Sequence, residues 1–404
     1  MLGQFVPGNT GGLDILEHPI NLDEKKGETA RSGRAGFAHA CMDNKQLRGA
    51  VIGYGFISSQ GHIPVYRERN RTLGDVKIVA LADICPVRRS SAREAVPGAR
   101  IYSDYRALLE TEAARLDFVD IATPPYEHAA IARAALLSGV HVLCEKPLAC
   151  STEEARSLLD HAQRVKKVIF PCHNYKHAPM IKAIREIIHS GRIGKVRSVT
   201  LNTYRNTHAR GMSQWNSHWR RESRYSGGGI AMDHGSHSLY LTFDWLGSYP
   251  TAVSAKMSNL EPGRYDTEDE FTAVLNFSTG VAHLHLTWTA GVRKLIYTIE
   301  GEKGLVTMKD DDLQIEIFKN GHFPDNAGIV NGEKKSITSH WEDASHASWF
   351  NALFDEFRGA IERHDFAGKD AREALLCVEV INTAYRSARD GSRQLQVLSS
   401  SELI

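Results

Sequence analysis

The sequence carries almost no net charge. Its 49 Lys plus Arg nearly balance 48 Asp plus Glu, which leaves a formal net charge of +1 over 404 residues. Proteins that bind nucleic acid or an anionic membrane electrostatically carry basic patches, so this balance argues against both partners. The chain also lacks any apolar run of the roughly 20 residues needed to cross a bilayer. We therefore expect neither nucleic acid nor a membrane as a partner.

Cysteine is scarce and follows no known motif. None of the six cysteines forms a C-x-x-C pair, and most lie in apolar or strand-like segments typical of buried thiols: Cys41, Cys85, Cys144, Cys150, Cys172 and Cys377. Such thiols suit a reducing compartment. The first residues, MLGQFVPGNTGGLDIL, have neither a basic segment nor a long apolar one. We therefore expect no secretory signal and a cytoplasmic protein.

Residues 1–46 have no sustained hydrophobic period. They are Gly-rich and mixed in charge, and we predict an N-terminal extension or arm. Two interpretations stay open: a segment with little role of its own, or an arm that packs on a neighbouring subunit or over a cofactor. Because 404 residues exceed what one hydrophobic core usually serves, we expect two further domains, 47–172 and 173–404.

Apolar runs alternate with amphipathic segments from residue 47 to about 172. This alternation predicts a doubly wound parallel sheet with helices on both faces. After about residue 174, strand-like segments with alternating polarity follow one another, and we interpret 304–318 as one such stretch. They predict an α+β domain with a large, mostly antiparallel open sheet and helices on one face. The overall fold class is therefore α/β.

A glycine-rich turn follows the first apolar run. The segment VIGYGFIS contains Gly53-x-Gly55-x-x-Ser58, the dinucleotide-binding fingerprint with Ser in place of the third Gly. Glycines there permit a tight turn and close approach of the backbone to a pyrophosphate at a helix N-terminus. We assign Gly53, Gly55, Phe56 and Ile57 to the cofactor site of a Rossmann domain. A mere tight turn is the alternative interpretation.

Asp83 ends the second apolar run. It lies a little farther from Gly55 than the roughly 20 residues usual for the acidic residue of this motif. A carboxylate there accepts hydrogen bonds from ribose hydroxyls and repels a 2′-phosphate, which favours NAD over NADP. Arg88 and Arg89 follow closely and leave NADP open. We assign Asp83 and Arg88 to the cofactor site.

A later buried run ends in Glu145-Lys146-Pro147. Ligands bind outside the carboxyl ends of parallel strands, so Glu145 and Lys146 are expected to face the cleft. A lysine there can bond a substrate hydroxyl and stabilise developing alkoxide charge. The alternative is an ordinary surface ion pair. We assign Glu145 to the cofactor and Lys146 to cofactor, substrate and catalysis.

The segment SGGGIAMDHGSHSLY (226–240) combines three glycines with Asp233, His234 and His237. Asp233 and His237 are four residues apart, so they share one face of a helix, whereas His234 is expected to point away and to be a packing residue. The three glycines are expected to let the chain pass close to cofactor and substrate. A neutral imidazole suits proton abstraction from an alcohol, and Asp233 can orient either the substrate or the imidazole. A metal site is the alternative, but no third ligand or supporting motif is evident, so we expect none.

At these motifs the chain resembles the Gfo/Idh/MocA family (glucose–fructose oxidoreductase, inositol dehydrogenase and rhizopine catabolism). The matching segments lie between about residues 48 and 395 and occur in family order: VIGYGFIS, ALADICP, DFVDIATPPYEHAAIARAALLSGVHVLCEKPLA, IREIIHSGRIGKVRSV, HWRR and GGGIAMDHGSH. The E-K-P triplet and the G-G-G-x-x-x-D-x-x-x-H box are the most specific. The resemblance implies an NAD(P)-dependent dehydrogenase acting on a CH–OH group of a sugar or polyol.

The resemblance also implies roles for single residues. Lys146 matches a lysine that contacts substrate hydroxyl and nicotinamide, and His237 matches the general base of relatives that oxidise secondary alcohols, beside the acidic Asp233. Further cofactor contacts are implied for Thr123, Pro124, His128, Trp219 and Arg220. The sequence departs from the family at Ser58 and at Tyr175-Lys176-His177, where many members have Arg-Phe or Lys-Tyr. We assign Tyr175 to the substrate site.

Residues 204–225 are rich in arginine and tryptophan. We interpret the stretch as a substrate-binding flap, in which Trp215 stacks on a sugar and Arg205 binds hydroxyl, carboxylate or phosphate groups. A solvated loop is the alternative interpretation.

The main functional hypothesis is a sugar, inositol or sugar-derivative dehydrogenase in which Lys146, Asp233 and His237 perform the chemistry. One alternative is an NAD-dependent glycosidase or epimerase-like enzyme that oxidises transiently, without net redox. Another is a cofactor-sensing regulatory protein, which need not retain these three residues and would need a DNA-reading surface. The exposed edge of the second sheet suggests a homo-oligomer, a dimer or tetramer.

Overall fold

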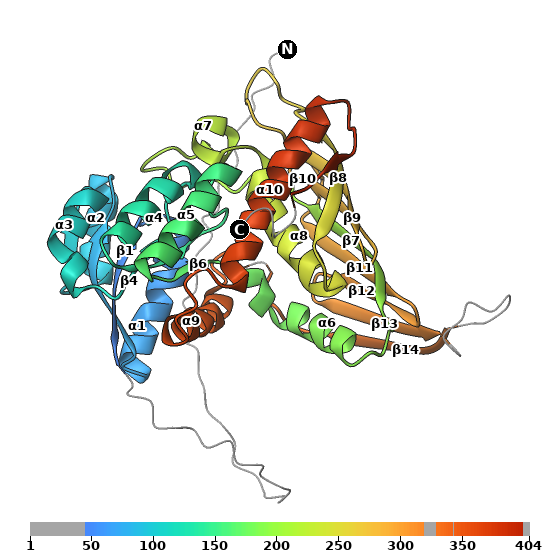
Figure 1. Ribbon diagram of the computed structural model, residues 1–404, viewed down its shortest axis with the longest axis horizontal. Coiled ribbons are helices and arrows are strands. Elements are labelled where there is room, and N and C mark those ends of the chain that lie inside the picture. The colour runs from blue at the N-terminus through green and yellow to red at the C-terminus, as the bar shows by residue number, and fades with distance from the viewer. Residues whose placement is uncertain (1–44, 319–328, 342, 399–404) are drawn as a thin grey trace, which may run out of the picture. The chain divides into compact units, whose positions relative to one another are not determined.

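The computed structural model describes residues 45–318, 329–341 and 343–398 (Figure 1). All of them belong to one compact unit that begins at Lys45. The predicted N-terminal extension, up to residue 44, and Cys41 within it lie outside the described residues.

The first sheet is the predicted doubly wound one. Within the described residues, six parallel strands lie in the order β3-β2-β1-β4-β5-β6. They are β1 (Leu47–Ile52), β2 (Val76–Ala82), β3 (Arg100–Tyr102), β4 (Phe118–Ile121), β5 (His141–Cys144) and β6 (Ile169–Pro171). The strand order reverses between β1 and β4, the point at which Rossmann sheets bind dinucleotides.

Helices follow the strands of this sheet. They are α1 (Ile63–Thr72), α2 (Pro86–Ala95), α3 (Tyr105–Glu112), α4 (His128–Leu137) and α5 (Thr152–Val165), with short helical turns at Ile57–His62, Ala113–Arg115 and Pro125–Glu127. A later helix, α9 (Ala347–Glu362), also joins this layer, beside α1 in Figure 1. Its Phe350, Phe354 and Phe357 share a hydrophobic cluster with Val51 and Phe118 of the sheet. The chain therefore returns to the first sheet after building the second.

The second sheet is large and mostly antiparallel, as predicted. Its strand order within the described residues is β14-β13-β12-β11-β7-β10-β9-β8-β15, and β7 and β10 run parallel. The strands are β7 (Val196–Tyr204), β8 (Pro250–Ser258), β9 (Glu270–Phe277), β10 (Val281–Thr287), β11 (Lys294–Gly301), β12 (Gly304–Lys309), β13 (Asp312–Phe318), β14 (Ile329–Ser336) and β15 (Leu395–Gln396). The interpretation of 304–318 as one stretch is wrong: the chain reverses between β12 and β13, where Asp310 has a φ of +53°.

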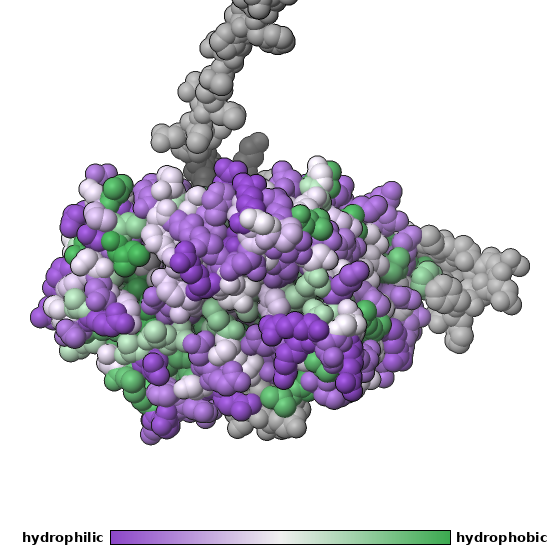
Figure 2. Space-filling model, turned by 90° about the horizontal axis from the view of Figure 1, so that it is seen from above, coloured by the Kyte–Doolittle hydropathy of each residue, from purple (hydrophilic) through white to green (hydrophobic). Residues whose placement is uncertain are grey.

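Helices cover one face of the second sheet in the described chain, the face toward the first sheet (Figure 1). They are α6 (Pro179–His189), α8 (Ile230–Leu246) and α10 (Lys369–Arg389), while the short α7 (Ser223–Ser226) and the turns Asn174–His177 and Trp219–Arg221 lie in the connections. On the face seen in Figure 2, hydrophilic residues predominate and hydrophobic ones form small groups. No helix among the described residues is long and apolar enough to cross a membrane.

Candidate active site

A cleft of about 830 Å³ opens at the carboxyl ends of the parallel strands. The turns after β1, β2, β4 and β5 line it, and so do α8 and the segment 205–212 that follows β7. The cleft therefore brings together the dinucleotide end of the first sheet and residues carried by the second.

The two glycines of the turn, Gly53 and Gly55, differ in the reason why a side chain is absent. Gly53 has a φ of +96°, and a Cβ there would lie 2.7 Å from the carbonyl oxygen of Ala122, so the fold itself requires glycine. A Cβ on Gly55 would meet no protein atom within 4 Å. The protein's own packing therefore does not explain Gly55, whereas a pyrophosphate lying against the turn does. This open space fits a dinucleotide.

Asp83 lies at the same end of the cleft and is buried. Its two carboxylate oxygens accept the backbone N–H groups of Tyr54 and Cys85, both at 2.7 Å. Arg88 also lines the cleft, with a guanidinium nitrogen 3.9 Å from Asp83. Two apolar side chains beside it, Phe56 (45% exposed) and Ile84 (65% exposed), offer surfaces that suit an adenine ring.

The cleft is lined by all but one of the residues assigned from the sequence: Gly53, Gly55, Phe56, Ile57, Asp83, Arg88, Thr123, Pro124, Glu145, Lys146, Tyr175, Arg205, Trp215, Trp219, Arg220, Asp233 and His237. His128 is the exception. It is fully buried, and its ring nitrogens lie 2.8 Å from the carbonyl oxygens of Thr123 and Pro147. Direct contact of His128 with a cofactor is not supported, because this ring instead braces two loops that line the cleft.

Lys146 and Asp233 meet across the cleft. The Lys146 ammonium donates to the backbone carbonyl of Asp233 at 2.5 Å and to its carboxylate at 3.2 Å. Arg220 donates to the same carboxylate oxygen at 3.4 Å. Burial alone would raise the pKa of Asp233, but Lys146, Arg220 and His234 outweigh it and hold that pKa well below its usual range. Asp233 is therefore ionised at neutral pH.

The three glycines before α8 make close contacts with protein, and none of them lines the cleft. A Cβ on Gly228 would collide with Tyr385, and a Cβ on Gly229 would collide with Glu268. The Glu268 carboxylate accepts the N–H groups of Gly229 and Ala231, both at 2.9 Å, and so caps the helix. The prediction that glycines are needed here to let the chain approach cofactor and substrate is therefore wrong. They are needed because Tyr385 and Glu268 pack directly against the backbone.

His237 lies one helical turn beyond Asp233 and is buried. Its ring stacks on Tyr175 at 3.9 Å between centroids, and its Nδ1 lies 2.6 Å from the hydroxyl of Tyr240. Burial, followed by the nearby Lys146, lowers the pKa of His237 well below its usual value, so its imidazole is neutral. Tyr240, not Asp233, orients this ring. Sequence reasoning missed Tyr240, although its i+3 spacing from His237 puts both on one helical face.

The sequence interpretation that His234 points away from the cleft is wrong. This residue lines the cleft, its Nε2 lies 3.8 Å from Asp233, and its ring centroid is 6.1 Å from that of His237. Burial lowers the pKa of His234 to about 3 despite the neighbouring carboxylate. The helix presents a wider arc to the cleft than the i,i+4 argument assumed. The lining also includes Asn174 and His346, which no sequence motif indicated.

The arginine- and tryptophan-rich segment follows the rim of the cleft. Arg205 and Trp215 line it, and Trp215 packs edge-on against Tyr225 at 5.1 Å. The guanidinium of Arg220 stacks over Trp219 at 4.1 Å while its Nε reaches Asp233. The segment thus contributes both aromatic surface and cationic donors to the site.

Comparison with known families agrees with this geometry. Residues 47–173 match the family model described as "Oxidoreductase family, NAD-binding Rossmann fold", and residues 181–307 match "GFO/IDH/MocA C-terminal domain". The chain belongs to the Gfo/Idh/MocA family of oxidoreductases. It is accordingly an NAD-binding oxidoreductase.

Several members of the Gfo/Idh/MocA family are similar over much of the chain. D-glucoside 3-dehydrogenase of Escherichia coli K12 is 25% identical over 375 residues, which are 88% of this chain and 99% of the relative. Levoglucosan dehydrogenase of Pseudarthrobacter phenanthrenivorans is 27% identical over 247 residues, 53% of this chain and 60% of the relative. A solved levoglucosan dehydrogenase in complex with NADH shares the fold, with a TM-score of 0.73, 22% identity and coverage of 88% of this chain and 100% of that one.

Proposed function

We propose that the protein is an NAD-dependent dehydrogenase that oxidises a CH–OH group of a sugar, an inositol or a sugar derivative. The observation that carries the proposal is that Lys146, Asp233 and His237 line the same cleft as the glycine turn, with Lys146 bonded to Asp233. The names of the relatives, a glucoside dehydrogenase and a levoglucosan dehydrogenase, agree with this substrate class.

Lys146 supplies the positive charge of the site. Its ammonium can donate to the substrate oxygen and stabilise the alkoxide character that develops there. Ionised Asp233 holds the Lys146 side chain at 3.2 Å and can accept a second substrate hydroxyl. Bound NAD supplies the acceptor for the hydride that leaves the carbon.

His237 is proposed as the general base. For Nε2 to accept the proton of the substrate hydroxyl, the ring hydrogen must be on Nδ1. Nδ1–H then donates a hydrogen bond to the Tyr240 oxygen. The Tyr240 oxygen already accepts the backbone N–H of Tyr175 at 3.2 Å, and its two lone pairs can take both donors. If Tyr240 donated to Nδ1 instead, Nε2 would carry the hydrogen and could not act as a base. The proposal therefore requires Tyr240 to act as an acceptor.

The substrate end of the cleft combines charge with aromatic surface. Arg205 and Arg220 can bind hydroxyl or carboxylate groups, and Trp215 offers a face for a sugar ring. This composition supports a polyhydroxylated substrate over an apolar alcohol.

The test is a cofactor-reduction screen of polyols, inositols, sugar acids and nucleotide sugars, with NAD and NADP in parallel. With the best substrate, His237→Ala should lose at least about 100-fold in kcat, because general-base catalysis is worth that much, and should still bind NADH. His283→Ala, an exposed histidine on β10, is the matched control and should keep full activity. Unchanged turnover in His237→Ala would exclude it as the base. Substrate conversion without accumulating NADH would favour the glycosidase or epimerase alternative.

The cellular setting belongs to the same proposal. All five cysteines in the described chain are free thiols, which supports a reducing, cytoplasmic location. The second sheet is open, with β14 and β15 as its outer strands in the described chain, and such edges suit association into a dimer or tetramer. The division at residue 172/173 into a cofactor domain and a substrate domain also remains a proposal.

A further inference from the structure

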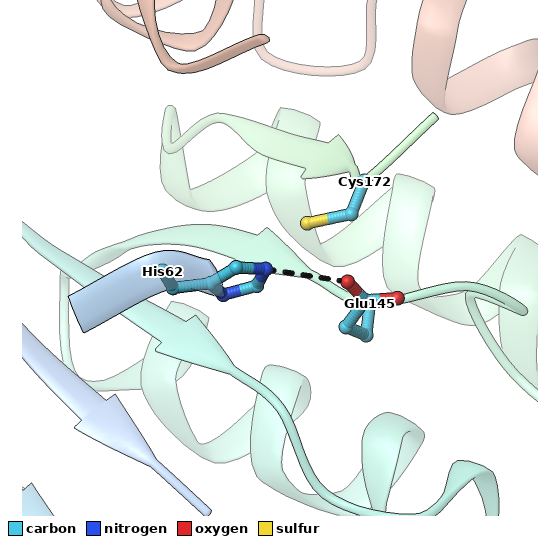
Figure 3. Close-up of side chains that lie close together, drawn as sticks. All are labelled: His62, Glu145 and Cys172. Carbon is cyan, nitrogen blue, oxygen red and sulfur yellow. Dashed lines mark ion pairs between the residues drawn. The ribbon is translucent and has the colours of Figure 1, made fainter. Parts of the chain in front are cut away.

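A buried histidine connects the glycine turn to the catalytic lysine. His62 ends the helical turn Ile57–His62 that begins two residues after Gly55, and its side chain is 1% exposed. Its Nε2 lies 3.4 Å from the Glu145 carboxylate. Figure 3 shows the ring turned toward this carboxylate. The other ring nitrogen, Nδ1, lies 2.9 Å from Asp120 of β4. One imidazole therefore joins two carboxylates beneath the cleft.

The surroundings fix this ring in place. It stacks on Phe350 of α9 at 3.7 Å between centroids, with 8° between the planes. Asp120, which is fully buried, also accepts the hydroxyl of Tyr66 from α1 at 3.0 Å. Cys172, after β6, completes the group of polar side chains around the ring.

The ring can donate a hydrogen bond to both carboxylates only if it is protonated. Burial acts to lower the pKa of His62, but Asp120 and then Glu145 raise it to about 9. Burial acts to raise the pKa of Glu145, but His62 and Lys146 lower it. A neutral imidazole has one N–H and would leave one of the two carboxylates facing a ring lone pair. An imidazolium donates to both.

Glu145 transmits this arrangement to the active site. Its second carboxylate oxygen accepts the backbone N–H of Lys146 at 3.1 Å. The Lys146 side chain then reaches Asp233. A connected path thus runs from the dinucleotide turn through His62 and Glu145 to the ammonium proposed to contact the substrate.

A metal ion is the competing interpretation of the same side chains. Ligand atoms of His62, Glu145 and Cys172 lie within 4.8 Å of one another. Both ring nitrogens already pair with carboxylates, however, and burial followed by Glu145 and Asp120 raises the pKa of the Cys172 thiol well above its usual value. The group is therefore better described by a proton on His62 than by a cation bound to it.

We propose that His62 is a positioning residue: as an imidazolium held between Asp120 and Glu145, it fixes Glu145 and thereby the backbone of Lys146 at the reacting group. The proposal rests on the dehydrogenase function proposed above. It makes the catalytic lysine depend on a charge that lies outside the cleft and never touches the substrate.

The test replaces His62 with a side chain that cannot be charged. His62→Gln should lower kcat by about 10- to 100-fold, the effect of displacing a catalytic group by a fraction of an ångström to an ångström. The KM for NAD should change far less than kcat. Tyr66→Phe is the matched control, because it removes a neutral donor from Asp120 and leaves His62 between its carboxylates; its kcat should stay within about twofold of wild type. A folded His62→Gln protein with wild-type kcat would overturn the proposal.

A second variant covers the case in which His62→Gln does not fold. Asp120→Asn keeps the shape of the side chain but removes one carboxylate from His62, so the alkaline limb of kcat should move about 1–2 units toward lower pH. An alkaline limb that does not move would contradict the proposal. The histidine ring can also be observed without turnover: its NMR signals should report imidazolium at pH 8. If no CH–OH compound is oxidised, only the proposed dehydrogenase function fails. A neutral His62 at pH 8 would instead refute the imidazolium between Asp120 and Glu145. One equivalent of zinc in the purified protein would refute it as well.

Discussion

The proton on His62 should be visible in the stability of the protein, independently of any substrate. The folded pKa of this histidine is about 9, against about 6.5 in an unfolded chain. Between these values the native protein keeps a proton that the unfolded chain has released. The stabilisation is therefore fully present below pH 6.5 and is lost as the pH rises through 9. The variant His62→Gln lacks this dependence.

The magnitude follows from the difference between the two pKa values. A shift of about 2.5 units corresponds to about 3 kcal/mol of free energy of unfolding, of which about 1.5 kcal/mol should disappear between pH 6.5 and pH 8. Other histidines and the thiols also titrate near this range. Their contributions cancel in the difference between wild type and His62→Gln, because both proteins contain them.

The assay is urea unfolding at pH 6.5, 7.25 and 8, with the free energy of unfolding extrapolated for both proteins. The advantage of wild type over His62→Gln should shrink steadily by about 1.5 kcal/mol across the three values. A constant advantage would show that His62 is neutral in the folded state or titrates equally in both states. An advantage that grows with pH would mean that burial, not the two carboxylates, controls the ring.

Gly55→Ala should weaken NADH binding by about tenfold at unchanged melting temperature, because the added Cβ has open space on the protein side and only a bound ligand would meet it. Gly53→Ala should instead lower the melting temperature by several degrees, because its positive φ and its backbone neighbour exclude a Cβ. Asp83→Ser should raise the ratio of kcat/KM with NADP to that with NAD by about tenfold or more, since a like charge facing the 2′-phosphate is removed; an unchanged ratio would place the ribose elsewhere. Trp215→Ala should raise the substrate KM more than it lowers kcat, and unchanged kinetics would make the rim segment a plain loop. Tyr240→Phe should reduce kcat about tenfold with normal NADH binding, because Nδ1 of the base loses its acceptor; full activity would show that the tautomer is set by another group.

Much of the cofactor end could be predicted from the sequence because its signals are local. The apolar run, the Gly53-x-Gly55 turn and the next helix follow one another within a few residues, and strand ends carry Asp83 and Lys146. Parallel strands bring their carboxyl ends to one edge, so the cleft follows from chain order alone. The cleft lining agrees with these assignments.

The substrate end could be predicted only in part. Spacing by four put Asp233 and His237 on one face of α8, and both line the cleft. The same rule predicted that His234 points away from the cleft, which is wrong. A helix lying along a cleft exposes more than one row of side chains to it. The glycines before the helix had a packing reason, the contact with Tyr385 and Glu268, which lie far away in the sequence.

The sequence by itself determined the alternation of strands and helices in the first sheet, the dinucleotide turn and the three side chains proposed for catalysis, because hydrophobic period, turn chemistry and helical spacing act over short stretches of chain. Only the tertiary structure decided which buried groups pair. His62, Asp120 and Glu145 come from separate elements, and their protonation depends on distances that no local pattern encodes. The same holds for His128, whose ring is turned to two backbone carbonyls instead of the cleft. Burial makes such pairings energetically decisive, and burial exists only once the layers have packed together.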